Sequence, residues 1–181
     1  MSKIGKKNIN IPQGVEIEQT DCDIKIKGPL GELHVNLPNG FQFERVENGI
    51  KIYPVSEDKN SRALWGTTAA NIKKSIIGVT QAFERKLEVE GVGYKVDIQG
   101  KDLVLNIGFS HQVKINIPDT LKVKTEKNTI IINGISSQEV GQFAAKVRSK
   151  RSPNAYKGNG IRYSDEIIKK KAGKKIAGAT S

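Results

Sequence analysis

The sequence contains a single cysteine, few aromatic residues and no long run of apolar residues. Among its 181 residues, Cys22 has no second cysteine to pair with, which is typical of a reducing compartment. No uninterrupted apolar run exceeds three residues, whereas a membrane-spanning helix needs about 20. The Met-Ser-Lys-Ile-Gly start also lacks the apolar core of a secretory signal. We therefore expect a soluble chain that is not exported.

Acidic residues are outnumbered, and the imbalance is confined to the two ends of the chain. The sequence has 30 Lys and Arg against 19 Asp and Glu, a formal net charge of +11. Residues 1–7 carry +3 and residues 146–181 carry +9, so the part between them carries −1. A pI of about 9.7 favours a polyanionic partner. The placement of the charge predicts cationic arms on a neutral body.

The chain contains an internal repeat with a period of about 80 residues. Three pairs of segments align: 23–27 with 102–106, 35–38 with 115–118, and 48–52 with 128–132. Within the first copy, apolar and polar residues alternate as in strands with one buried face. The strands expected from this alternation are 15–18, 24–27, 33–37, 41–43 and 50–52. Turns rich in Gly, Pro and Asn separate them, which indicates antiparallel hairpins.

Each strand region is followed by a helix pattern. The alternation stops near Ser56, and the spacing of a helix face then appears at Ile72, Ile76, Val79 and Phe83. In the second copy, Ser136 and Glu139 form a capping-box pattern that opens a helix through Val147.

The predicted fold class is therefore α+β, with two tandem, similar domains, each an antiparallel sheet covered by one helix, plus a basic C-terminal extension. The expected divisions are residues 1–82, with the basic N-terminal end, residues 83–150, and residues 151–181, an extension that packs with the second domain and RNA.

Patterns for catalysis or metal binding are sparse. His34 alternates as a polar strand position and His111 sits in a turn, so we interpret both as surface or turn residues. Cys22 lies between two aspartates, which disfavour a reactive thiolate. The glycine-rich segments 91–94 and 157–160 match no nucleotide-binding loop. An enzyme, a metal, a cofactor and a small-molecule substrate are not expected.

The C-terminal tail has the composition of an RNA-binding arm. Its candidate contact residues are Arg148, Lys150, Arg151, Tyr156, Lys157, Arg162, Tyr163, Lys169, Lys170, Lys171, Lys174 and Lys175. Cations neutralise phosphates, tyrosine can stack on a base, and the interspersed glycines permit close approach. The alternative is a solvated basic tail that only keeps the protein soluble. The same choice applies to Lys3, Lys6 and Lys7.

Several motifs occur in an order that resembles one family. They are Ser2-Lys3-Ile4-Gly5-Lys6-Lys7, Lys27-Gly28-Pro29-Leu30-Gly31-Glu32-Leu33, Arg62-Ala63-Leu64-Trp65-Gly66-Thr67-Thr68, Glu90-Gly91-Val92-Gly93-Tyr94-Lys95, Gly108-Phe109-Ser110-His111 and Tyr156-Lys157-Gly158-Asn159-Gly160-Ile161-Arg162-Tyr163. Together they resemble the bacterial-type large-subunit ribosomal protein six family over nearly the whole chain. The last motif is the most specific.

This resemblance implies two similar α/β domains, no catalysis, and binding to large-subunit rRNA near the sarcin–ricin loop and the stalk base. The partners it implies are this rRNA, neighbouring ribosomal proteins at the stalk base, and translational GTPases nearby, without a membrane. The implied location is the cytoplasmic ribosome, with an organellar ribosome as the open alternative.

The resemblance also assigns RNA-facing residues. Lys157 and Arg162 are expected to contact phosphates, with Gly158 and Gly160 permitting the close approach. Turns of the second domain are expected on the RNA side through Gly91, Gly93, Tyr94, Lys95, Ser110 and His111. For the last two residues, a purely structural turn is the alternative.

The sequence departs from the family pattern at several positions. Asn159 and Ala69 stand where lysine and arginine are common, which weakens the phosphate contacts expected there. Trp65 stands where histidine is common, and we expect it to pack on the sheet of the first domain. Asn154-Ala155 replaces a common Glu-Pro. Because the tail lysines are retained, we expect the affinity to be redistributed rather than lost.

The leading hypothesis is a structural rRNA-binding component of the large ribosomal subunit. One alternative is a free-standing RNA or DNA chaperone without sequence preference, and another is an enzyme of unknown type. The absence of a clustered acid, base or metal constellation argues against the enzyme.

Overall fold

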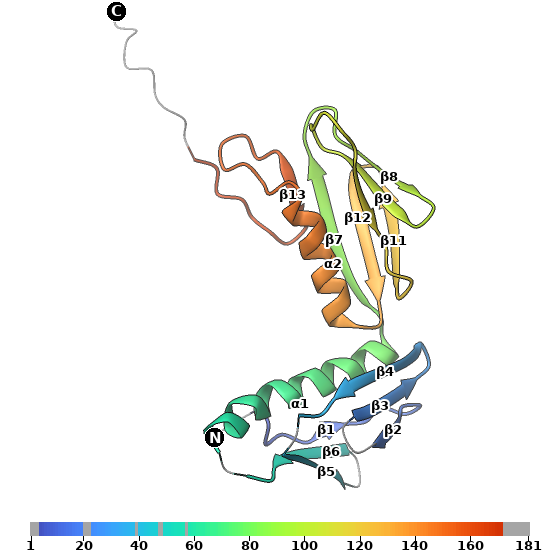
Figure 1. The fold of residues 1–181 in the computed structure, drawn as a ribbon, viewed down its shortest axis with the longest axis vertical. Helices are drawn as coiled ribbons and strands as arrows, with labels where there is room; N and C mark the ends of the chain where they lie inside the picture. Colours follow the sequence, from blue (N-terminus) through green and yellow to red (C-terminus); the bar gives the residue numbers. More distant parts are fainter. Residues whose placement is uncertain (1–3, 20–22, 39, 47–48, 57, 172–181) are drawn as a thin grey trace, which may run out of the picture. The chain divides into compact units, whose positions relative to one another are not determined.

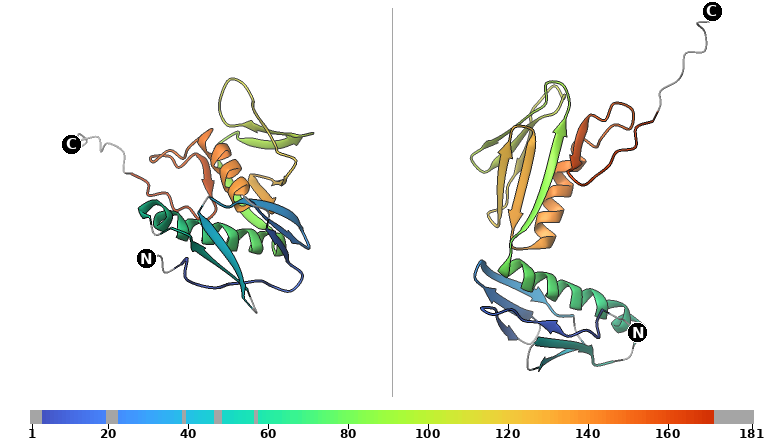
Figure 2. Two further views of the ribbon diagram at one scale, coloured as in Figure 1. Left: turned by 60° about the horizontal axis from the view of Figure 1, so that its bottom comes forward. Right: turned by 180° about the vertical axis from the view of Figure 1, so that it is seen from behind.

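The computed structural model describes residues 4–19, 23–38, 40–46, 49–56 and 58–171, and Figures 1 and 2 show its ribbon. The chain divides into two compact units. Unit 1 comprises Met1–Phe83 and Gly134–Ser137, and unit 2 comprises Glu84–Asn133 and Gln138–Ser181. Within the described residues, each unit combines one helix with antiparallel strands, which confirms the α+β fold class. The return of residues 134–137 to unit 1 is not indicated by the repeat.

The described strands of unit 1 form two antiparallel sheets, where the sequence suggested one. The first has the order β1-β6-β5, with β1 (Ile9–Asn10), β6 (Gly49–Pro54) and β5 (Phe41–Val46). The second has the order β2-β3-β4, with β2 (Glu16–Gln19), β3 (Asp23–Gly28) and β4 (Gly31–Asn36). All five predicted strands are present, and the prediction missed only the short β1.

Helix α1 (Lys59–Thr80) packs against β3, β4 and β6 and thus joins both sheets of unit 1 (Figure 1). Its buried residues include Ile72, Ile76 and Val79, as their spacing predicts. The prediction that Phe83 continues this face is wrong, because Gln81 is extended and Phe83 begins the next strand. The Phe83 ring still approaches α1, since a Cβ on Gly78 would lie 2.9 Å from it. This packing explains why Phe83 fits the helical spacing.

Unit 2 repeats the strand arrangement of unit 1. One sheet has the order β10-β9-β8, with β8 (Lys95–Gln99), β9 (Asp102–Asn106) and β10 (Val113–Asn116). The other has the order β11-β12-β7-β13, with β7 (Phe83–Glu90), β11 (Leu121–Glu126), β12 (Thr129–Gly134) and β13 (Gly160–Tyr163). Strands β7, β12 and β11 correspond to β1, β6 and β5, as a tandem duplication requires. Helix α2 (Ser137–Ser149) begins directly after Ser136, where the capping box predicts it.

Strand β13 has no counterpart in the described part of unit 1. It pairs antiparallel with β7, with Gly160 opposite Glu90 and Tyr163 opposite Leu87. Its residue Ile161 is fully buried. Part of the basic extension is therefore a structural element of unit 2 (Figure 2).

Candidate nucleic-acid interface

Three connections in unit 2 surround a hollow of about 620 Å³. They are the β7–β8 turn, the β9–β10 loop and the connection from α2 to β13. The hollow is lined by Tyr94, Phe109, Lys150, Arg151, Ser152, Asn154, Lys157 and Asn159. These residues are aromatic, cationic or uncharged and polar, and no acidic residue is among them. The lining therefore suits an anion with an aromatic part.

The ring of Tyr94 is fixed between two glycine-containing turns. A Cβ on Gly91 would lie 2.6 Å from this ring, and a Cβ on Gly108 would lie 3.1 Å from it. Only glycine lets the backbone come so close. The N–H of Tyr94 also donates to the carbonyl of Gly91 at 3.3 Å. The β7–β8 turn and the β9–β10 loop are thus held together around one wall of the hollow.

Phe109 provides a second ring, and it is 38% exposed. The ring of His111 stacks on it with centroids 6.0 Å apart and 16° between the planes. The guanidinium carbon of Arg151 lies 5.0 Å from the Phe109 centroid. Aromatic rings and guanidinium planes are the groups on which unpaired bases stack. The predicted residues Ser110 and His111 are both exposed in this loop.

The connection from α2 to β13 is closed by hydrogen bonds to Asn154. Its Oδ1 accepts the N–H of Tyr156 at 2.8 Å and the N–H of Lys157 at 3.4 Å. Its N–H donates to the carbonyl of Asn159 at 2.9 Å, and its carbonyl accepts the N–H of Gly158 at 2.8 Å. Asparagine favours turns for this reason. The exposed Lys157 is therefore presented from an ordered loop.

The two glycines of the specific motif admit parts of the protein itself. Gly160 has a φ of +145°, and a Cβ there would lie 2.7 Å from the Cα of Pro153. Gly158 has a φ of +81°, and the Lys170 side chain passes 3.0 Å from the position of its Cβ. The N–H of Lys171 donates to the carbonyl of Ala155 at 2.8 Å. In this structure the close approach at both glycines is made by the chain's own atoms.

Two arginines of the predicted set are engaged by carboxylates. Arg148 donates from Nε and Nη2 to both carboxylate oxygens of Glu166, at 2.8 and 2.5 Å. The Arg148 guanidinium holds the pKa of Glu166 below its ordinary value, and Glu166 raises the pKa of Arg148. Arg162 lies 2.7 Å from Glu88 and 3.7 Å from Glu90 of β7. Both arginines thus brace β13 and the segment after it within unit 2.

The tyrosines of the motif have different surroundings. Tyr163 is half-buried, with the Arg148 guanidinium 5.6 Å from its ring centroid. Tyr156 is 61% exposed. Tyr156 is therefore open to a ligand, whereas Tyr163 is part of the brace.

The other predicted contact residues are distributed over both units. Of these residues, Lys95, Lys169, Lys170 and Lys171 are exposed in unit 2. Gly93, with a φ of +75°, is in the β7–β8 turn. In unit 1, Lys6 and Lys7 are exposed beside Gly5, which packs on Trp65. Outside the described residues lie Lys3, Lys174 and Lys175.

The sequence prediction missed four residues that line the hollow, namely Phe109, Ser152, Asn154 and Asn159. A signal for Phe109 was present, because it stands next to Ser110 and His111 in the same motif. The Asn-Ala-Tyr sequence was a signal for the turn at Asn154, since asparagine often bonds to the backbone two residues further on.

Trp65 packs in the core of unit 1, as predicted. It is 9% exposed, and its Nε1 donates to the carbonyl of Ile52 at 2.6 Å. Ala69, one helical turn later, is buried in the same core. The two departures from the family pattern on α1, Trp65 and Ala69, are thus core positions. His34 is exposed on β4, with its Nε2 3.9 Å from a carboxylate oxygen of Glu32.

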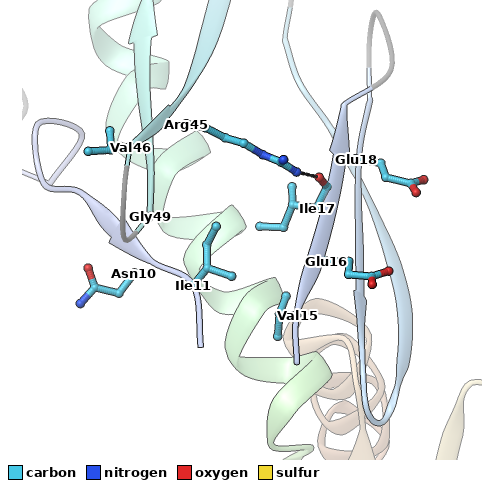
Figure 3. A pocket seen from close by; sticks show the side chains of 9 residues that line it. All are labelled: Asn10, Ile11, Val15, Glu16, Ile17, Glu18, Arg45, Val46 and Gly49. Carbon is cyan, nitrogen blue, oxygen red and sulfur yellow. Dashed lines mark hydrogen bonds between the residues drawn. The ribbon is translucent and has the colours of Figure 1, made fainter. Parts of the chain in front are cut away.

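A larger cavity, of about 870 Å³, opens in unit 1 between β2 and the β5–β6 hairpin (Figure 3). Arg45 reaches across it and donates to the carbonyl of Ile17. Two exposed carboxylates, Glu16 and Glu18, belong to its lining. Because carboxylates repel phosphate, the hollow of unit 2 is the better candidate for nucleic acid.

Other kinds of site find no support in the described part of the chain. It contains no group of three or more Cys, His, Asp and Glu residues placed to hold a metal ion. None of its helices has the length and apolar character needed to cross a membrane.

Comparison with known proteins extends these observations to nearly the whole chain. A family model described as ribosomal protein L6 matches residues 11–82 and 90–164. The large ribosomal subunit protein uL6 of Beijerinckia indica subsp. indica is 46% identical over 176 residues, which is 97% of this chain and 99% of the relative. The protein of the same name from Lactiplantibacillus plantarum is 45% identical over 175 residues, 96% of this chain and 98% of the relative. The uL6c protein of Arabidopsis thaliana is 45% identical over 175 residues, 96% of this chain and 78% of the relative.

The duplicated fold and these relatives define a structural protein of the ribosome, without enzymatic activity. The chain belongs to the ribosomal protein L6 family. The resemblance carried by its motifs and the expectation that it is not an enzyme are both confirmed.

Proposed function

We propose that this protein assembles into the large ribosomal subunit by binding its rRNA with the hollow of unit 2 and the lysines around it. The proposed location is near the sarcin–ricin loop and the stalk base, next to other ribosomal proteins, where it supports the docking region of translational GTPases. This location follows from the family resemblance. The observation that carries the binding surface is the cluster of Lys150, Arg151 and Lys157 beside the rings of Tyr94 and Phe109.

The chemistry of this cluster suits rRNA. Cations that neutralise phosphates release counterions, and aromatic rings add stacking that does not depend on salt. The hydrogen bonds to Asn154 order the loop before binding, which lowers the entropy lost on association. Arg148 and Arg162 already form ion pairs with carboxylates, so in this proposal they position the surface rather than contact phosphates.

Salt dependence tests the binding surface. Replacing Lys150, Arg151 and Lys157 by Gln should weaken binding to a large-subunit rRNA fragment that contains the sarcin–ricin loop. Because each phosphate contact contributes about 0.7–0.9 to the slope of log K against log salt, the slope should fall by about 2–3. The matched control replaces three exposed lysines of unit 1, Lys51, Lys59 and Lys74. Equal changes in slope for the two triple variants would contradict the proposal.

Two further measurements test specificity and location. At one salt concentration, the protein should bind this rRNA fragment more tightly than unrelated RNA, since phosphate contacts alone give equal affinities. Equal affinities would favour a chaperone without sequence preference. In growing cells the protein should sediment with the large subunit, and hydroxyl-radical footprints should fall near the sarcin–ricin loop. A wholly free protein would refute the assembly, and footprints elsewhere would refute the location.

A further inference from the structure

We infer that the hollow of unit 2 binds one unpaired RNA nucleotide, with its base against the rings of Tyr94 and Phe109 and its phosphate held by Lys150, Arg151 and Lys157. The inference rests on the proposed rRNA binding. It adds the chemical class of the ligand, an unstacked nucleotide rather than a continuous duplex.

The shape of the site favours a single protruding group. A volume of about 620 Å³ falls within the range of about 300–1,000 Å³ that is typical of small-molecule pockets. In an A-form duplex the base faces are stacked on each other and are not offered to the protein. The Phe109 ring already has His111 and Arg151 beside it, and the rings of the hollow can take a base as a further stacking partner only if that base leaves its helix.

The polar lining matches the remaining parts of a nucleotide. Oδ1 of Asn154 already accepts two backbone N–H groups, so its amide N–H groups are what it can offer to a ligand. Ser152 and Asn159 add a hydroxyl and a second amide, which can each donate and accept. With the three cations, the hollow provides stacking, hydrogen bonding and charge on one side of unit 2.

The duplication shows that these parts are additions to the shared fold. In unit 1, β3 and β4 are joined by the tight turn Pro29–Leu30, because Gly28 pairs with Gly31. The corresponding strands β9 and β10 are joined by the longer loop 107–112, which carries Phe109 and His111. The connection from α2 to β13 is also specific to unit 2, because the described part of unit 1 has no strand that corresponds to β13. The hollow therefore belongs to unit 2 alone and does not come from the duplicated fold.

Footprinting with three reagents tests the inference on the full chain bound to large-subunit rRNA. Hydroxyl radicals report the backbone, dimethyl sulfate reports unpaired adenine and cytosine, and a water-soluble carbodiimide reports unpaired uracil and guanine. We expect the wild-type protein to protect a stretch of backbone and one unpaired base within it. Phe109→Leu should lose the protection of that base, keep the backbone footprint, and bind roughly 5- to 150-fold more weakly, since stacking on an aromatic ring is lost. Tyr53→Leu, at a partly buried ring of unit 1, is the control and should change neither footprint.

A second arm changes the RNA instead of the protein. An abasic residue at the protected position should weaken wild-type binding by a similar factor and should have no further effect on Phe109→Leu. If the wild-type protein protects no backbone at all, the proposed rRNA binding itself fails. If the backbone is protected but no base depends on Phe109, or if the abasic RNA binds as tightly as the intact RNA, the inference is overturned while rRNA binding stands.

Discussion

Strand β13 ties the basic extension to unit 2 through Ile161, and truncating this side chain should destabilise the unit. Ile161 has 0% exposure in a strand that pairs with β7. Replacing a fully buried isoleucine by alanine costs about 2–5 kcal/mol, because apolar contacts are lost and a cavity remains. For a domain of roughly 60–100 residues, each kcal/mol lowers Tm by about 4–8 °C. The expected fall for Ile161→Ala is therefore at least about 8 °C.

The assay is urea and thermal unfolding of the full chain, followed by far-UV circular dichroism. Ile167→Ala is the matched control, since it makes the same change six positions later at a side chain that is 90% exposed. Its free energy of unfolding should stay within about 0.5 kcal/mol of the wild type. If both variants unfold at the same urea concentration, the extension is not part of the core of unit 2 and the reasoning is wrong.

Two other substitutions address the same extension. Gly160→Ala should lower the free energy of unfolding by about 1–3 kcal/mol, because the new Cβ would lie 2.7 Å from the backbone of Pro153 at a φ of +145°. The control is Gly141→Ala in helix α2, where a Cβ would have no atom within 4 Å, and it should raise the free energy of unfolding by about 0.5–1 kcal/mol. Urea unfolding measures both changes. Glu166→Gln should lower stability at neutral pH. Because Arg148 lowers the folded pKa of Glu166, its contribution is present above the ordinary value of about 4.3 and is lost as the pH falls through the folded value. Unfolding curves of this variant and the wild type should therefore converge in acid and differ above about pH 5, and a constant difference would refute this account.

Most of the fold could be predicted from the sequence because several strands bury one face and expose the other. Apolar and polar residues alternate visibly where one face of a strand is buried and the other is exposed to solvent, as in β3 and β4. Strand β1, with only Ile9 and Asn10, is too short to show a period. Phe83 was misplaced because it contacts α1 from the next strand, which the spacing alone does not distinguish from the helix. The division of each unit into two sheets depends on long-range pairing, which local pattern does not specify.

The candidate site was predicted only in part, for a different reason. Composition singled out Lys150, Arg151 and Lys157, and the structure brings them to one hollow. Composition could not single out Phe109, because an apolar residue in a loop is expected to be buried, and only the folded structure shows that this one is exposed beside the cations. Nor could it pair Arg162 with Glu88, which are more than 70 positions apart and meet only because β13 docks on β7.

The paired arginines change what the positive charge of the extension means. A count of basic residues treats Arg148 and Arg162 as phosphate contacts, yet their guanidinium groups already face carboxylates. If either arginine exchanged its carboxylate, Glu166 or Glu88, for a phosphate, the unpaired carboxylate would lie beside the RNA and repel its phosphates. The number of phosphate contacts obtained from a salt slope should thus be smaller than the number of cations in residues 146–181. Deleting that whole segment would not measure the effect of its charge alone, because the deletion also removes the buried Ile161 and the end of α2. The extension thus contains a strand that completes unit 2, together with the arginines that brace it, and a loop with exposed cations that we propose contacts RNA.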